Sequence, residues 1–321
     1  FDRWSMDDYY GFNAFFQRIG RKKGEDPRET IVFTKGDGEA KHPVDGRVVP
    51  PRFLGGGEPD LKKNEDRRVA LAEWLTAPGN PYFAPNLANI TWAHFMGQGI
   101  TEPVDDVRIS NPPSNPELLE ALAKRLVESG YDFKALVRDI CASHTYQRST
   151  RPKPGNESDT RNFAKADVRR IRAEVLLDVI SAVTSTKDKF KGLPLGARAV
   201  QIADGTTTEY FLTAFGRATR GTVCSCEVKM EPNLSQALHL LNGDTTHKKV
   251  REGGVVRRLI EQQVAPVAII DDIFLRCLAR LPTAAEKAAL MPEVEAAADK
   301  AAILEDIFWA VLNSKEFMFN H

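Results

Sequence analysis

The sequence predicts a mainly α-helical protein, an irregular multi-helix domain with a small β-hairpin region near its N-terminus. Apolar residues recur at helical spacing through most of the chain beyond residue 65. Short β-prone runs bounded by turn residues are concentrated before residue 50. Of the 321 residues, 42% are hydrophobic, which is ample for a sizeable core.

The N-terminal segment is predicted to hold one short helix and a hairpin region. Asp7–Arg18 is rich in aromatic residues whose side chains can form the buried face of a helix. Thr30–Phe33 and Arg47–Val49 are β-prone runs, and glycine, proline and aspartate mark turns between them. We therefore expect strands joined by turns in this region.

A domain boundary is expected where the hairpin region ends. The stretch Pro50–Pro59 cannot continue a regular element, because its prolines lack N–H donors and its glycines are conformationally permissive. This division assigns residues 1–60 to a first domain and residues 61–321 to a helical domain.

The helical domain begins with Arg68–Leu75, which Pro78 and Gly79 end. A second helix is expected from Pro81 to about Phe95, with one stripe expected to pack on the core. That stripe comprises Phe83, Leu87, Ile90 and His94. Ser114 or Asn115 can cap a third helix, with Pro116 in its first turn. Further helices are predicted over Leu118–Glu128, Phe133–Ser143, Arg170–Val183, Ser235–Leu241, Val255–Gln263, Ile269–Leu281, Thr283–Ala297 and Ile303–Phe317.

Charge and hydropathy exclude two broad classes of partner. Lys plus Arg and Asp plus Glu each total 44, so no net field favours nucleic acid. No apolar run approaches the roughly 18 to 20 residues that a membrane-spanning helix needs. We expect neither nucleic-acid binding nor a membrane span, and any specificity must be local.

The first candidate site combines the second helix with the loop that follows it. Its polar residues are Asn86, Asn89, Trp92, His94, Asp105, Asp106 and Arg108. One histidine and two carboxylates close in sequence could bind a divalent cation. In the alternative interpretation, His94 packs on the apolar stripe, and Asp105 and Asp106 cap backbone amides or pair with Arg108. No second histidine stands at a metal-ligand spacing.

The second candidate site is the pair Cys224 and Cys226, followed by Glu227. Such a pair can be a redox dithiol or half of a soft-metal site, but tetrahedral zinc needs further ligands. A local disulfide, two separate bridges and free buried thiols remain open. Cys141 and Cys277 lie in apolar helical patterns and are expected to be buried and inert.

Several motifs stand in an order seen in one family. Among them are Arg68–Thr76, Asn89–Gly99, Asn111–Leu119 and Leu312–Phe317. The chain resembles exported planctomycete proteins in which the domain of unknown function 1549 precedes the planctomycete-specific domain of unknown function 1553. In that comparison the N-terminal segment is similar to the C-terminal end of the first domain, and the remainder to the second.

The resemblance implies a cellular compartment and accompanying modules for the chain. Such proteins are often fused to cytochrome-c-like modules, which implies export to the periplasm or beyond and upstream cytochrome-like partners. Any c-type haem would belong to a segment upstream of this chain. Covalent haem attachment needs Cys-x-x-Cys-His, and Cys224–Glu227 has neither the spacing nor the histidine. No cofactor is therefore expected within the chain, apart from the divalent metal considered above.

Two functions follow as hypotheses. The first is an accessory or binding module that engages an extracellular polymer such as a polysaccharide, or another chain of the assembly. The second is an extracellular enzyme acting on a polysaccharide or in electron transfer. Its cleft would lie between Asn86–Arg108 and Cys224–Asn233, and His94, Asp105 and Asp106 would serve as acid, base or metal ligands.

Overall fold

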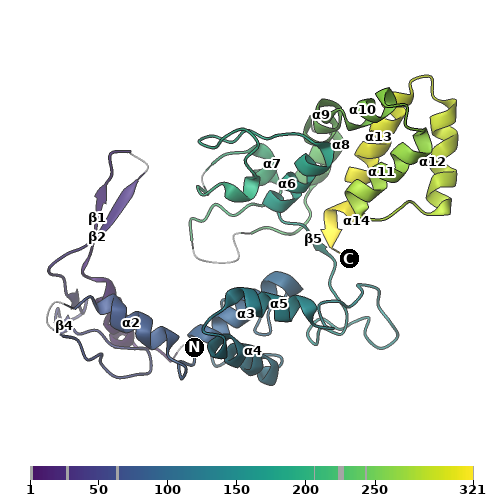
Figure 1. Cartoon of the computed structure of the whole chain (residues 1–321). Coiled ribbons are helices and arrows are strands. Elements are labelled where there is room, and N and C mark those ends of the chain that lie inside the picture. Colours follow the sequence, from purple (N-terminus) through teal and green to yellow (C-terminus); the bar gives the residue numbers. More distant parts are fainter. Residues whose placement is uncertain are drawn as a thin grey trace. The chain divides into compact units, whose positions relative to one another are not determined.

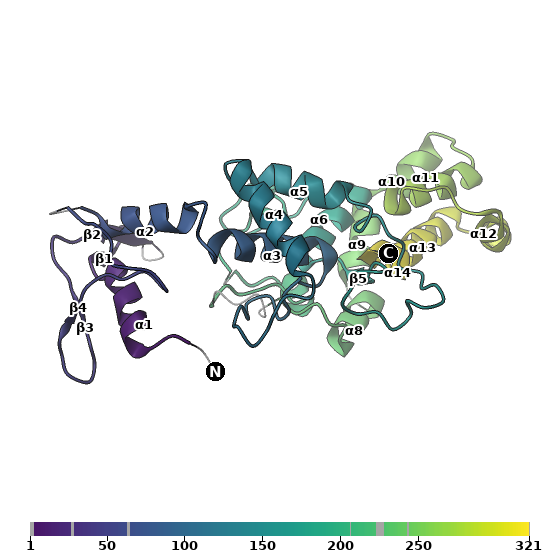
Figure 2. The ribbon, with the colours of Figure 1, turned by 90° about the horizontal axis from the view of Figure 1, so that it is seen from below.

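The computed structural model describes residues 3–26, 29–62, 65–205, 207–222, 228–242 and 244–320. Within these residues the protein is mainly helical, with antiparallel hairpin strands near the N-terminus, which confirms the predicted fold class (Figure 1, Figure 2). The chain forms two compact units. Unit 1 comprises Phe1–Gln147 and Ser158–Ala164, and unit 2 comprises Arg148–Glu157 and Lys165–His321.

Unit 1 opens with a helix that is shorter than predicted. Helix α1 (Met6–Asn13) begins at a capping box, in which Ser5 Oγ accepts from the Asp8 N–H and the Asp8 carboxylate accepts from the Ser5 N–H. A single 3-10 turn, η1 (Ala14–Phe16), follows α1. The helix does not reach Arg18, because the chain turns there into a strand.

Two antiparallel hairpins occupy the predicted hairpin region. Strand β1 (Ile19–Lys23) pairs with β2 (Thr30–Thr34), and β3 (Ala40–Lys41) pairs with β4 (Val48–Val49). Gly20 lies opposite Phe33. A Cβ atom on Gly20 would lie only 2.4 Å from the Phe33 ring, so the aromatic ring covers the glycine across the hairpin.

The rest of unit 1 is a small helical bundle. Its helices are α2 (Arg67–Thr76), α3 (Phe83–Met96), α4 (Pro116–Glu128) and α5 (Phe133–Ala142). Asn115 caps α4 by accepting from the Leu118 N–H, with Pro116 as the first helical residue, as predicted. Helices α3, α4 and α5 pack against one another around Trp92, Ile100, Leu126, Leu136 and Ile140.

Unit 2 is a larger helical assembly in which α13 packs against α9, α10, α11, α12 and α14. Its helices are α6 (Ala173–Thr184), α7 (Tyr210–Ala214), α8 (Leu234–Asn242), α9 (Asp244–Gly253), α10 (Val255–Glu261), α11 (Pro266–Leu278), α12 (Ala284–Ala296), α13 (Lys300–Leu312) and α14 (Lys315–Met318). A 3-10 turn η2 (Ala199–Gln201) and the short strands β5 (Arg169–Arg170) and β6 (Phe319–Asn320), which pair antiparallel, complete unit 2.

Several features of unit 2 differ from the sequence prediction. Arg170, predicted to begin a helix, lies in strand β5, and α6 begins only at Ala173. Helices α7 and α9 were not predicted, and the predicted helix Ile303–Phe317 is divided between α13 and α14. Ser314 causes the division, because its hydroxyl accepts from the Phe317 N–H and caps a new helix. Helix α9 gives little apolar periodicity, since polar residues such as Thr246 and Lys249 lie on its buried face.

None of the helices in the described residues combines the length and the apolar character that crossing a membrane requires. The predicted boundary between the two family domains, near residue 60, lies within unit 1. The two units are defined by how residues pack, so they do not test where one family domain ends and the next begins. That boundary stays a prediction.

Candidate functional site

The loop after α3 is held by one buried asparagine. Asn89 is 1% exposed, and its Nδ2 donates to the carbonyl oxygens of Thr101 at 3.0 Å and Val104 at 3.5 Å. Its Oδ1 accepts from the Thr101 N–H at 3.0 Å. Both ends of the amide therefore satisfy backbone groups, and Asn89 positions the loop that carries the two candidate aspartates.

Asp106 in this loop forms a two-bond ion pair with Arg108. Arg108 Nε and Nη2 donate to the two carboxylate oxygens at 2.6 and 2.5 Å. The Arg108 side chain, helped by its backbone N–H, lowers the pKa of Asp106 below the ordinary value. A catalytic acid at neutral pH needs a raised pKa, so this pairing disfavours that role for Asp106. Asp105 and His94 are exposed.

The predicted stripe of α3 is buried only in part: Leu87 packs against the core around Trp92, and Phe83 is half-buried. Ile90 is 42% exposed and His94 is exposed as well, so these two positions were wrongly assigned to the core. Trp92 is instead in the core, with its ring edge-on to Phe163 at 5.2 Å. Within the described residues, Trp92 Nε1 and Asn86 Oδ1 are buried without a hydrogen-bond partner.

The metal hypothesis finds no assembled ligand set in the part of the chain that the structure describes. No group of three or more His, Cys, Asp or Glu side chains lies there in a metal-binding arrangement. Cys224, Cys226 and Glu227 lie outside the described residues. Cys141 and Cys277 are free and half-buried, and burial raises the pKa of the Cys277 thiol to about 12. The metal and catalytic hypotheses for both candidate sites stay predictions.

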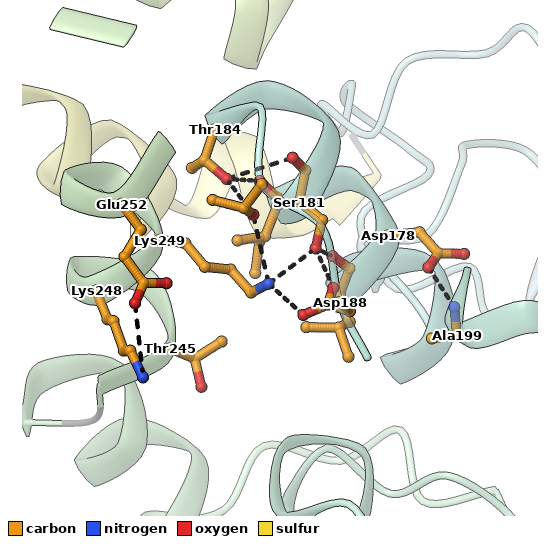
Figure 3. Close-up of polar contacts among 12 residues, drawn as sticks. Asp178, Ser181, Thr184, Asp188, Ala199, Thr245, Lys248, Lys249 and Glu252 are labelled. Atoms are coloured by element: carbon orange, nitrogen blue, oxygen red, sulfur yellow. Dashed lines mark hydrogen bonds and ion pairs between the residues drawn. The ribbon is translucent and has the colours of Figure 1, made fainter. Parts of the chain in front are cut away.

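Unit 2 contains a buried polar cluster that the sequence did not reveal (Figure 3). Lys249 of α9 is 9% exposed and forms an ion pair with Asp188. Its ammonium also donates to Ser181 Oγ of α6 at 3.1 Å and to Thr186 Oγ1 at 3.4 Å. All three N–H donors of the ammonium can thus be satisfied inside the protein.

This cluster fastens α9 to α6. The Ser181 hydroxyl lies 2.8 Å from the Leu177 carbonyl and 2.5 Å from Asp188 Oδ2, so its proton stays within the cluster. Gly253 at the end of α9 allows the close approach, since a Cβ atom there would lie 1.7 Å from the Thr184 carbonyl oxygen. An ammonium paired with a carboxylate cannot take the serine proton, which favours a packing role.

Among its described residues, unit 2 has a concave surface beside α13, which we call the α12–α13 groove. It has a volume of about 900 Å³, at the upper end of the range of about 300 to 1,000 Å³ that is usual for ligand sites. Residues of α11, α12 and α13 form its apolar walls. The main apolar contributors are Phe274, Leu278, Leu290, Ile303, Ile307 and Trp309.

Arg280 holds the groove in shape. Its guanidinium donates to both carboxylate oxygens of Glu286 on α12, at 2.9 and 2.8 Å. It also donates to both carboxylate oxygens of Glu316 on α14, at 2.6 and 2.7 Å. Arg280 lowers the pKa of Glu286 to about 2. This doubly bidentate ion pair ties the start of α12 to α14 and so fixes one wall of the groove.

Further carboxylates lie along the groove without such a partner. Glu293 of α12 and Asp306 of α13 line it from two walls, both are exposed, and neither forms an ion pair with the described residues. His247 of α9 also contributes to the lining. The described lining residues include no lysine or arginine, so the groove combines apolar walls with a negative rim.

The sequence carried one signal of this groove. Helix α13 is apolar on nearly every side: Leu304 and Phe308 are completely buried, while Ile303 and Ala310 line the groove on another face. A helix that is hydrophobic all round is normally covered all round. The apolar face of α13 that its neighbours leave uncovered is therefore a candidate ligand surface. The sequence shows that α13 is apolar on several sides, but only tertiary packing decides which side stays exposed.

The fold and the groove define a helical domain with an open apolar surface. The chain belongs to the family described as PSD1, protein of unknown function (DUF1553), whose model matches residues 67–293. This match supports the expected domain of unknown function, while its place as a second domain stays a prediction. Neither a curated protein nor a solved structure was found to match the chain.

Proposed function

We propose that this chain is a noncatalytic binding module that holds an apolar part of another molecule in the α12–α13 groove. The observation that carries the proposal is the groove itself, with about 900 Å³ of space and walls of aliphatic and aromatic side chains. Removing apolar surface from water contributes roughly 25 cal/mol per Å², so filling such a groove can stabilise a complex.

The groove is suited to binding because its walls are supported from behind. Leu304 and Phe308 anchor α13 in the core of unit 2, and Arg280 clamps α12 through Glu286. A preformed site avoids part of the conformational entropy that would otherwise be lost on association. Trp309, half-buried in the lining, belongs to the residue types that contribute most to binding surfaces.

A neutral fluorescent probe tests this proposal. N-phenyl-1-naphthylamine is expected to brighten in the presence of the protein, and an Ala310→Trp variant, which fills the groove, is expected to lose this effect. Ala302→Trp is the matched control, because Ala302 is exposed on the same helix and does not line the groove. Equal fluorescence with both variants would show that the probe binds elsewhere, and no enhancement with the wild-type protein would contradict the proposal.

The resemblance supports a setting for the module. We propose that it belongs to an exported planctomycete protein, follows a domain of unknown function 1549, and works beside cytochrome-c-like modules on an extracellular polymer or on another chain. Haem absorbance and cell fractionation of the native full-length protein test this setting. Elemental analysis of the same protein and of an Asp105→Asn, Asp106→Asn variant tests the divalent-metal alternative, which requires metal that the variant loses.

A further inference from the structure

We infer that the ligand of the α12–α13 groove is a basic amphipathic α-helix of a protein partner. The inference rests on the proposed function and adds the chemistry of the ligand to it. Two independent features of the groove carry it: the length over which α13 lines it, and the charge along its rim.

The groove is long enough for about two turns of a helix. Its lining on α13 extends from Ile303 to Val311, and on α12 from Glu286 to Glu293. At a rise of 1.5 Å per residue, the α13 wall is about 12 Å long, or about two helical turns. An amphipathic helix inserts apolar residues at i, i+3 or i+4, and i+7, which are distributed over such a length. A compact small molecule would use only part of it.

The charge of the rim selects a basic helix. Glu286 and Glu316 share the positive charge of Arg280, whereas Glu293 and Asp306 have no such partner among the described residues. These last two carboxylates come from different walls, α12 and α13. A docked helix with Lys or Arg beside its apolar stripe can place a cation near each of them. Acidic residues in the same positions would be repelled.

Three matched peptides test the inference. Each is a lactam-bridged helix with the same leucine stripe, and the flanking positions are all lysine, all glutamine or all glutamate. Binding to the whole chain is measured by fluorescence anisotropy of a label at the peptide terminus. The lysine peptide is expected to bind most tightly and the glutamate peptide most weakly, with a difference that disappears at about 1 M salt, where the Debye length is about 3 Å.

A pair of double variants assigns the effect to the rim. Glu293→Gln with Asp306→Asn is expected to weaken binding of the lysine peptide about fivefold at low salt and to leave binding of the glutamine peptide unchanged, since exposed rim charges each contribute a modest attraction. Glu261→Gln with Glu295→Gln is the matched control. It removes two exposed carboxylates of unit 2 that lie outside the groove and is expected to change neither affinity.

The possible failures are distinguishable. If the glutamine and lysine peptides bind equally well, or if both double variants weaken the lysine peptide equally, the inference is wrong while an apolar binding groove remains. If only a small organic cation such as decyltrimethylammonium binds, and no peptide does, the helical ligand is wrong. If neither the peptides nor the neutral probe binds, the proposed function fails as well.

Discussion

Replacing Lys249 by methionine is expected to destabilise unit 2 strongly. The substitution keeps most of the apolar stem and removes the charge that Asp188 and Ser181 surround (Figure 3). Asp188 would then retain one hydrogen bond, from Ser181, and would lose its cation. A partly buried carboxylate without a counter-charge raises the free energy of the folded state.

The magnitude follows from the exposure of the pair. The side chains of Lys249 and Asp188 are 11% and 20% exposed. Breaking a fully buried pair costs about 3–5 kcal/mol, and a solvent-exposed pair contributes at most about 1 kcal/mol. We therefore expect a loss of about 2–3 kcal/mol, since water still reaches the aspartate. For a unit of this size, the melting temperature should fall by about 5–10 °C.

Urea unfolding followed by pulsed hydrogen exchange and mass spectrometry measures this loss separately for each unit. Peptides from α6 and α9 should lose protection at lower urea in Lys249→Met, and peptides from α4 and α5 should not change. Lys248→Met is the control, because its pair with Glu252 is exposed on the same helix and should contribute under about 0.5 kcal/mol. Equal effects of the two substitutions would show that the buried pair of Lys249 stabilises unit 2 no more than an exposed pair does.

Three further predictions concern stability and reactivity. The Glu286 pKa falls from 4.5 to about 2 in the folded state, so its stabilisation is complete above pH 4.5 and is lost as the pH falls towards 2. Because solvent screens this partly exposed pair, the stabilisation by Glu286 amounts to about 1 kcal/mol. Between pH 4.5 and 2 the urea midpoint of the wild-type protein should fall accordingly, and the midpoint of Glu286→Gln should lack this contribution. The raised pKa of Cys277 should make its thiol far less reactive in the folded protein than in urea, measured with a thiol reagent in a variant whose other cysteines are serine; equal rates would contradict this. Asn89→Ala should cost about 2–3 kcal/mol by leaving backbone groups of the loop unpaired, and a loss below 0.5 kcal/mol in thermal unfolding would show that water replaces the amide.

The elements that the sequence predicted are those with local signals. Asn115 and Pro116 start α4 through neighbouring backbone groups, and the apolar periodicity of α5 reports its buried face directly. Helix α9 lacked such a signal, because Lys249 is buried only through partners on distant segments. Periodicity rules treat a lysine as exposed and so miss a helix of this kind.

The contacts of the candidate site also fall into those that neighbouring residues in the sequence can predict and those that they cannot. Pairing of Asp106 with Arg108 was an alternative that two-residue spacing allowed, and the structure contains it. The backbone contacts of Asn89 depend on the path of the loop after α3, which no local pattern specifies. The groove depends on which face of α13 its neighbours leave uncovered, and the sequence of α13 alone does not specify that face.

Nuclear magnetic resonance can locate the binding surface of this module directly. The lysine peptide is titrated into isotopically labelled protein, and the signals of the backbone and of the tryptophan indoles are followed. We predict shifts of the Trp309 indole and of backbone amides along α12 and α13, with Trp74 and Trp92 unchanged. Shifts concentrated at Asp105 and Asp106, with a constant Trp309 signal, would show that the peptide binds at the loop after α3 and not in the α12–α13 groove.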